Sequence, residues 1–303
     1  MEVVRYASPY PDLRSQQAYP YTLRFDLAEA EPEVDLVSEF EGIENVIVHK
    51  AAPAFIQEIY DNLPEPMQKC LTGMHGARVR MHFIAGVARY RISYLMASLV
   101  LFDIFGIGLE QPNKLKVLYI MNNNVGIETF YQHLTRTFRI WNFTDEQLDS
   151  VLNIMRLYPL DGEVHDIVTT DLVDELVTSE NANRDKSLHQ FALRTLEQNQ
   201  DPQQYRELKQ LLASVADGTR LGEGDFAKTK TNMKKLYRDT FNGFSGVVVT
   251  TPVGASPLLV RESFKPDTII VDEAATMDEA TLSIVITSER QKFICLNTTF
   301  TYI

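Results

Sequence analysis

The chain has 303 residues, of which 45% are hydrophobic and 23% charged, and its formal net charge is −12 at pH 7. This hydrophobic content excludes a globally disordered chain, and the negative charge argues against a broad basic face that grips phosphate backbones. Its two cysteines are too few for a disulfide framework or a structural zinc site, and no apolar run is long enough to span a bilayer. The composition predicts a protein of the cytoplasm or nucleus that has no membrane contact.

The first 62 residues differ from the rest of the chain. They contain prolines at positions 9, 11, 20, 32 and 53, and the stretch 26–41 is acidic. Because proline interrupts regular elements, this pattern predicts short strands and loops. We interpret residues 1–62 as an accessory N-terminal region.

From residue 63 onward, short apolar strands alternate with helices. The sequence predicts strands at 79–85, 116–121, 245–251, 268–271 and 292–296, and helices at 93–105 and 125–138. Apolar strands that alternate with helices are typical of a parallel sheet covered on both faces. The predicted fold class is therefore α/β.

A long insertion at about 141–240 separates the two halves of this pattern and is expected to be mainly helical, with a break at Pro202. Its first part is acidic, with eleven Asp or Glu against three Lys or Arg over residues 145–186. Its end is basic and contains Lys228, Lys230, Lys234, Lys235 and Arg238. Such charge runs are most often solvated helix faces, and the alternative for the basic run is contact with nucleic acid.

Two adjacent carboxylates, Asp272 and Glu273, end the apolar run at 268–271. An aspartate at the carboxyl end of a strand can hold Mg²⁺ through water, and a neighbouring glutamate can polarise an attacking water molecule. The alternative is an acidic turn that caps the next helix.

A second motif, Gly86-Val-Ala-Arg89-Tyr-Arg91-Ile92-Ser93, follows the first predicted strand and opens a helix. It matches the phosphate-binding pattern G-x-x-x-x-G-K-[ST] at its first and last positions, whereas Arg91 and Ile92 replace the second glycine and the lysine. Loss of the lysine removes a charge-assisted contact of about 1.5–3 kcal/mol. Arg89 or Arg91 could supply a guanidinium in its place.

In their order along the chain, these segments resemble superfamily 1 DNA/RNA helicases, in the group of the nonsense-mediated-decay RNA helicases and senataxin. That family has a P-loop, a nucleic-acid motif A-P-[ST]-N-x-A-x-D, a T-T-x-x-x-[AG] motif and then D-E-A-[AST]. The corresponding segments here are the Gly86 motif, Met121-Asn-Asn-Asn124-Val-Gly-Ile-Glu128, Val249-Thr250-Thr251-Pro-Val-Gly-Ala255 and Asp272-Glu273-Ala-Ala275.

The resemblance implies a RecA-like P-loop NTPase domain that takes ATP and Mg²⁺ and contacts single-stranded RNA or DNA weakly. It assigns catalysis to Asp272 and Glu273 and the metal to Ser93 and Asp272. It assigns ATP binding to Gly86, Arg89, Arg91, Ser93 and Gln68, where Gln68 takes the place of an adenine-reading glutamine. It assigns nucleic-acid binding to Asn124, Thr250 and Thr251, helped by Lys234 and Lys235 of the basic run.

The chain also departs from the family. After the strand at 292–296 the family has G-D-x-x-Q-L, whereas this chain reads Asn-Thr-Thr-Phe-Thr-Tyr-Ile and stops before a second RecA-like domain. We therefore expect residues 63–303 to form one incomplete motor domain with Gly86 and Asp272 at the same sheet edge. Three functions stay open: a degenerate helicase domain with little or no ATP hydrolysis, an ATP-binding module completed by a second domain elsewhere, or an interaction protein that retains the fold.

Overall fold

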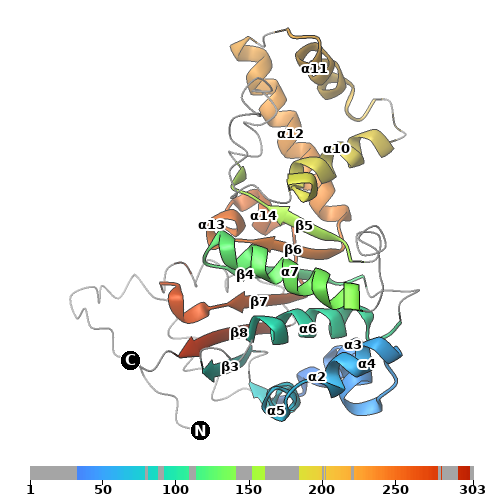
Figure 1. Cartoon of the computed structure of the whole chain (residues 1–303). Coiled ribbons are helices and arrows are strands. Elements are labelled where there is room, and N and C mark those ends of the chain that lie inside the picture. Colours follow the sequence, from blue (N-terminus) through green and yellow to red (C-terminus); the bar gives the residue numbers. More distant parts are fainter. Residues whose placement is uncertain are drawn as a thin grey trace, which may run out of the picture.

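The fold is an α/β sheet structure, shown in Figure 1. This computed structural model describes residues 33–78, 81–87, 92–108, 114–140, 152–160, 184–199, 201, 203–219, 222–278, 281 and 293–300. The strands are β1 (Glu33–Val34), β2 (Ala77–Arg78), β3 (Met81–Val87), β4 (Lys116–Met121), β5 (Ile154–Leu157), β6 (Gly246–Thr250), β7 (Thr268–Asp272) and β8 (Phe293–Phe300). They form one sheet in the order β1-β2-β3-β8-β7-β4-β6-β5. Every pair from β3 to β5 is parallel, and β1–β2 and β2–β3 are antiparallel.

The helices alternate with these strands over most of the chain. They are α2 (Leu36–Glu39), α3 (Glu41–Glu44), the π-helix η3 (Asn45–His49), α4 (Ala54–Asp61), α5 (Glu65–Thr72), the 3₁₀-helix η4 (Gly73–Gly76), α6 (Ile92–Phe105), α7 (Asn124–Ile140), the 3₁₀-helix η7 (Arg184–Lys186), α10 (Leu188–Gln198), α11 (Arg206–Ala216), α12 (Glu223–Gly243), α13 (Pro252–Ala255), α14 (Leu258–Ser263) and the 3₁₀-helix η8 (Ala274–Thr276). The predicted α/β class and parallel sheet are confirmed.

Helices cover both faces of the sheet, as the apolar strands predicted. In β4, Tyr119 and Met121 belong to one core together with helices α2 to α7, whereas Leu118 and Ile120 belong to a second core with α10, α11, α12 and α14. This split follows from strand geometry, because successive side chains point to opposite faces. Successive residues of β4 are therefore buried on opposite faces of the sheet, and the sequence of the strand is a continuous apolar run.

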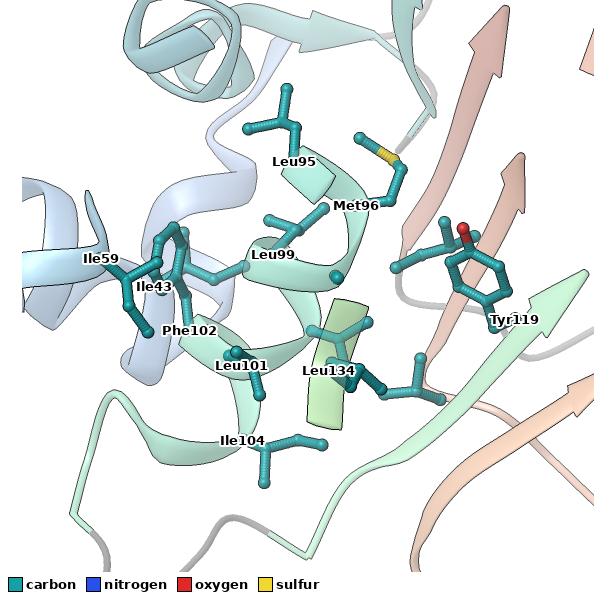
Figure 2. Close-up of a cluster of buried hydrophobic side chains, with 14 of the residues drawn as sticks. Ile43, Ile59, Leu95, Met96, Leu99, Leu101, Phe102, Ile104, Tyr119 and Leu134 are labelled. Carbon is teal, nitrogen blue, oxygen red and sulfur yellow. The ribbon is translucent and has the colours of Figure 1, made fainter. Parts of the chain in front are cut away.

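Helix α6 lies in the middle of the first core. Figure 2 shows its side chains between Ile43 and Ile59 of the N-terminal helices on one side and Tyr119 and Leu134 on the other. Residues 95–105 of α6 are buried on all sides of the helix. The helix is covered by protein on two opposite sides, so no side of it faces solvent. This explains why its sequence has no polar face.

The prediction of short strands and loops before residue 62 is wrong for the part that the structure describes, because residues 36–61 are mostly helical. These helices contact α6 closely, and a Cβ atom added at Gly106 would lie only 2.0 Å from the carbonyl oxygen of Gly42. Leu36, Ile43 and Ile56 share one core with α6. The described part of the N-terminal region therefore packs as a layer of the same core.

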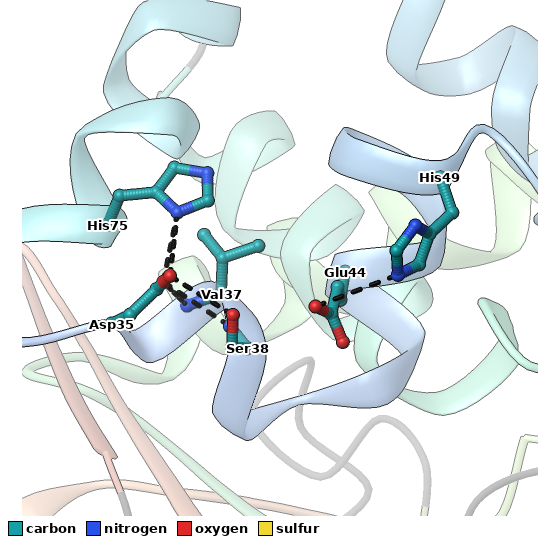
Figure 3. A network of polar contacts seen from close by, with 6 residues as sticks. All are labelled: Asp35, Val37, Ser38, Glu44, His49 and His75. Carbon is teal, nitrogen blue, oxygen red and sulfur yellow. Dashed lines mark hydrogen bonds and ion pairs between the residues drawn. The ribbon is translucent and has the colours of Figure 1, made fainter.

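Polar contacts fix the start of this layer (Figure 3). The Asp35 carboxylate accepts hydrogen bonds from the backbone N–H groups of Val37 and Ser38, and its Oδ1 lies 3.0 Å from Nδ1 of His75. A second pair joins Glu44 to His49 at 3.6 Å. Burial raises the pKa of Asp35, but the hydrogen bonds with His75 and Ser38 outweigh it and lower the pKa overall. Asp35 thus caps α2 and ties it to η4.

The insertion is mainly helical where it is described, but it also supplies a strand that the sequence analysis missed. Strand β5 pairs with β6 at the edge of the sheet. Helices α10 and α11 are separate, as the predicted break requires, although Pro202 itself lies outside the described residues. Helices α11 and α12 extend away from the sheet (Figure 1). The Tyr205 hydroxyl donates to Asp239 at 2.5 Å and links the two helices.

Among the helices that the structure describes, none combines the length and the apolar character needed to cross a membrane.

Candidate functional site

The two motifs singled out in the sequence lie at the same edge of the sheet. Strand β8 lies between β3 and β7, and both Phe83 and Val271 are opposite Leu296. Asp272 is therefore level with Ile84, and Gly86 lies two residues further toward the carboxyl edge. Because β8 separates them, the backbones of β3 and β7 are about 10 Å apart. The expectation of a shared carboxyl edge is confirmed.

The glycine motif differs from expectation in its detail. Strand β3 continues through Gly86, which is opposite Thr299, and ends at Val87. The predicted strand end at residue 85 is therefore two residues too early, and Gly86 belongs to the strand and not to the turn after it. Arg89 and Arg91 lie outside the described residues. Ser93 lies half-buried in the first turn of α6.

Gln68 has a structural contact. Its side-chain Nε2 donates to the backbone carbonyl oxygens of Tyr60 at 3.0 Å and Asp61 at 3.4 Å. These carbonyls belong to the last turn of α4, where helical carbonyl groups have no partner within the helix. The amide of Gln68 therefore caps α4.

Among the charged candidate residues that the structure describes, Asp272 is the most buried. Its side chain is 1% exposed, and its Oδ2 accepts a hydrogen bond of 2.6 Å from the Tyr119 hydroxyl. The Tyr119 ring in turn stacks on Phe130 of α7, with 3.6 Å between centroids and 20° between planes. Two strands and one helix thus hold the carboxylate in place. A hydrogen bond to a buried carboxylate is among the strong ones in proteins.

Glu273 lies in a different environment. It follows β7 with a φ of 56°, in the left-handed region that residues other than glycine seldom adopt. Its side chain is half-buried, and burial together with the negative charge of Asp272 raises the pKa of Glu273. Of the two adjacent carboxylates, Asp272 is enclosed by protein, whereas Glu273 is partly exposed to solvent. The pKa of Glu273 is raised, which brings it closer to neutral pH.

The described residues do not form a ready metal centre. No group of three or more His, Cys, Asp or Glu side chains in this part of the chain is placed to hold a metal ion. Asp272 and Ser93 belong to elements that cover the same core, but Asp272 is enclosed and one of its oxygens already accepts a hydrogen bond from the Tyr119 hydroxyl. Mg²⁺ requires an octahedral set of oxygen ligands and retains several waters, so Asp272 could supply at most part of such a set.

Three asparagines follow β4, at the same edge. The side-chain Nδ2 of Asn122 donates to the carbonyl oxygen of Thr276 at 3.0 Å, which ties the end of β4 to the turn after Glu273. Asn123 accepts from the backbone N–H of Gly126 at 2.6 Å and caps α7. Asn124 is exposed, and its Oδ1 accepts a 2.6 Å hydrogen bond from Nη2 of Arg156.

The two threonines at the end of β6, Thr250 in the strand and Thr251 directly after it, are not equivalent. Thr250 is fully buried, and its hydroxyl donates to the carbonyl oxygen of Leu157 at 2.8 Å. Thr251 is half-buried, and its hydroxyl accepts from the backbone N–H of Gly254, which caps α13. The predicted contact of Thr250 with nucleic acid therefore disagrees with its position, since its side chain is closed off from solvent.

Apolar side chains flank these polar groups. Val125 is 77% exposed at the start of α7, and Val253 is 66% exposed in α13. They follow β4 and β6, which are neighbours in the sheet. The edge between these two strands therefore offers polar and apolar contacts side by side.

Lys234 and Lys235 are exposed on α12. The ammonium of Lys235 lies 5.8 Å from the centre of the Tyr205 ring, and Lys228 on the same helix forms an exposed ion pair of 3.8 Å with Glu207. Helix α12 projects from the sheet (Figure 1), so the lysines belong to a separate element from the asparagines after β4. Lys234 and Lys235 are thus exposed to solvent, which both a solvated helix face and a contact with nucleic acid require.

The sequence analysis missed two residues of this edge, Tyr119 and Arg156. Each carries a polar group inside an apolar strand, Tyr119 in Lys-Val-Leu-Tyr-Ile-Met and Arg156 in Ile-Met-Arg-Leu. A buried hydroxyl or guanidinium requires a hydrogen-bond partner, so both were signals of a polar neighbour. The identity of that neighbour depends on strand order, which the pattern alone does not give.

Neither a protein-family model nor a curated protein sequence matches this chain.

Proposed function

We propose that this chain is a helicase-like nucleotide-binding domain that hydrolyses ATP slowly or not at all. The observation that carries the proposal is the parallel arrangement of β3, β8 and β7. It brings the carboxyl end of the Gly86 strand and the Asp272–Glu273 pair to one edge with a single strand between them. Ligands of parallel α/β sheets bind outside the carboxyl ends of the strands.

The start of α6 supports the same location. The helix begins at Ile92, five residues after β3 ends, and it is fourteen residues long. A long helix directs backbone N–H groups and the positive end of its dipole toward an anion at its start. A phosphate group at this place would lie on the same side of the sheet as Asp272, since α6 and Tyr119 share one core.

Two features support weak hydrolysis. Arg91 and Ile92 stand where the family pattern has glycine and lysine, which removes the charge that stabilises the transferring phosphoryl group. Asp272 is enclosed and hydrogen-bonded to Tyr119. Glu273, by contrast, is accessible and has a raised pKa, which suits a group that accepts a proton from water. Binding is thus supported better than turnover.

The experiment compares nucleotide binding with turnover. Thermal unfolding is measured with ATP, ADP and no nucleotide. A nucleotide at 100 times its dissociation constant should stabilise the native state by about 2.7 kcal/mol. Turnover is measured in parallel and should stay below about 1 s⁻¹. No stabilisation by any nucleotide would contradict nucleotide binding and favour an interaction protein. Turnover above that rate that is lost in Glu273→Gln would contradict slow hydrolysis.

A matched variant sharpens the same test. The double substitution Arg91→Gly with Ile92→Lys restores the family pattern, and it should raise nucleotide affinity more than turnover. Turnover should change less, because Asp272 remains enclosed by Tyr119. Equal gains in affinity and turnover would mean that the loop alone limits hydrolysis.

We also propose weak binding of single-stranded RNA or DNA at the ends of β4 and β6. The exposed Asn124 and half-buried Thr251 lie there beside the exposed Val125 and Val253. Polar groups suit phosphate and ribose oxygens, and the apolar groups suit sugar and base faces. With a net charge of −12, we expect a dissociation constant of about 10⁻⁴–10⁻⁶ M.

The contribution of α12 is tested separately by salt titration. Lys234→Glu combined with Lys235→Glu should weaken binding and flatten its dependence on salt if these exposed lysines contact phosphates. Unchanged affinity and salt slope would remove α12 from the binding surface and leave the strand ends.

A further inference from the structure

We propose that Arg156 is a positioning residue that fixes the side-chain amide of Asn124 as a hydrogen-bond donor toward the phosphodiester backbone of a single-stranded nucleic acid. The inference rests on the proposed nucleic-acid binding and adds the residue that sets the chemistry of the contact. It is carried by the geometry between β5, which the insertion supplies, and the start of α7.

Arg156 is itself held rigidly. Its side chain is 6% exposed, Nη1 donates to the carbonyl oxygen of Val249 at 3.3 Å, and the guanidinium lies 4.9 Å from the centre of the Tyr158 ring. A guanidinium that contacts an aromatic ring and a backbone carbonyl has little freedom to rotate. Its Nη2 is thereby directed at Asn124, 2.6 Å from Oδ1.

This contact decides which way the Asn124 amide points. A guanidinium carries N–H donors and no acceptor, so the atom of Asn124 that faces it must be the carbonyl oxygen. Rotation of the amide by 180° would place an NH₂ group against the N–H groups of Arg156. The donor-only partner therefore fixes the amide in one orientation.

The consequence is an exposed pair of donors. With Oδ1 engaged by Arg156, the Nδ2 group of the exposed Asn124 is the part of the amide that remains for a ligand. An amide free to flip can satisfy donors and acceptors alike, whereas a fixed one selects acceptors. Phosphate oxygens are acceptors only.

Two neighbouring features favour the same class of ligand. Asn124 is the first residue of α7, a helix of seventeen residues, so the positive end of that helix lies at this point. The buried positive charge of Arg156 lies directly behind the amide. Both polarise the amide toward donation and favour an anion over a neutral acceptor.

The test uses Asn124→Asp as its main variant, because aspartate retains an acceptor for Arg156 and replaces the outward donors by an anionic oxygen. The probes are fluorescent single-stranded dT₂₀ and rU₂₀ at constant low salt, with unfolding measured on the same samples. We expect unchanged or raised stability and at least a tenfold loss of affinity for both probes.

The role of Arg156 is tested by a double-substitution cycle. Arg156→Gln removes the charge and allows the amide to flip, so affinity should fall several-fold, and Arg156→Lys should recover part of that loss because an ammonium also only donates. In the Asn124→Ala background, Arg156→Gln should have no further effect on affinity. A merely structural role for Arg156 would instead lower stability with no coupling to Asn124 in binding.

The outcomes separate the two proposals. If the wild-type chain binds neither probe, the proposed nucleic-acid function is wrong and this inference with it. If the wild-type chain binds but Asn124→Asp binds equally well, only the inference is overturned. Additive effects of Arg156→Gln and Asn124→Ala on affinity would also overturn it.

Discussion

At the carboxyl end of β7, Asp272 is buried and accepts a hydrogen bond from Tyr119, whereas at the end of the neighbouring strand β4 Asn124 is exposed and accepts one from Arg156. In the first case both partners are enclosed, and in the second only the arginine is. An enclosed pair stabilises the fold and offers little to a ligand. A half-exposed pair leaves part of its hydrogen-bonding capacity for binding. We therefore expect substitutions in the Tyr119–Asp272 pair to act on stability, and substitutions in the Arg156–Asn124 pair to act on both stability and binding.

The largest expected effect is at the enclosed end. Tyr119→Ala removes a fully buried ring that stacks on Phe130, and it should lower the free energy of unfolding by about 3–5 kcal/mol. Tyr119→Phe retains the ring and removes the hydrogen bond to Asp272, for about 1–3 kcal/mol. Urea denaturation of both variants measures the difference, with Tyr94→Phe on α6 as the control for loss of a half-buried tyrosine hydroxyl. A Tyr119→Phe chain as stable as wild type would show that the enclosed pair is not stabilising.

The exposed end should respond more moderately in stability. Asn124→Ala removes a hydrogen bond from a charged donor and should cost about 1.5–3 kcal/mol, since the guanidinium of Arg156 is buried. Asn122→Ala removes a neutral hydrogen bond to Thr276 and should cost about 0.5–1.5 kcal/mol. Denaturation curves of the two single variants test the ranking, and a larger loss in Asn122→Ala would contradict it.

Asn123 lies between Asn122 and Asn124 in the sequence, and its side chain caps the start of α7. Asn123→Ala should destabilise the chain by about 1 kcal/mol, because it removes the cap on the Gly126 N–H at the start of α7. Asn123→Asp retains the cap and also places a negative charge at the helix start, so it should be neutral or stabilising in thermal unfolding. A loss of equal size in both variants would mean that the asparagine acts in another way.

The smallest effect is expected at Glu273, and its sign depends on pH. Burial and the charge of Asp272 raise the pKa of Glu273 above the ordinary value of 4.5, so the native state binds the proton more tightly than the unfolded state does. Stability from this group is present below the unfolded pKa and is lost as pH rises through the folded pKa. Glu273→Gln should therefore stabilise the chain slightly at pH 7 relative to pH 4. Melting temperatures across that range measure it, and a stabilisation that is larger at pH 4 would contradict the raised pKa.

The sequence predicted the repeating elements well where the apolar runs were long. Strand β4 and helix α6 match their predicted ranges to within one residue, because an uninterrupted apolar run bounded by polar residues has few alternative structures. Strand β5 was missed because four residues with a central Arg156 give no periodic signal. The N-terminal helices were missed because prolines indicate breaks but not the short helices between them.

The candidate site was predictable in outline but not in its contacts. The pattern located Asp272 and Asn124 at strand ends, since alternation fixes where strands stop. It did not reveal that Tyr119 encloses Asp272 or that Arg156 holds Asn124, because these contacts join residues 153 and 32 positions apart along the chain. Such pairs depend on the order of strands in the sheet, which the separate elements do not specify.

The position of β8 between β3 and β7 has a consequence for synthesis on the ribosome. Strand β3 emerges early, but its parallel partner β8 follows about 200 residues later. Because synthesis proceeds at roughly 5–20 residues per second, the edge of β3 that pairs with β8 stays unpaired for on the order of 10–40 s. Until then its backbone N–H and C=O groups form an open template for pairing with other chains. The newly made protein is thus expected to depend on chaperones through this interval, and translation speed between residues 87 and 293 should influence its soluble yield.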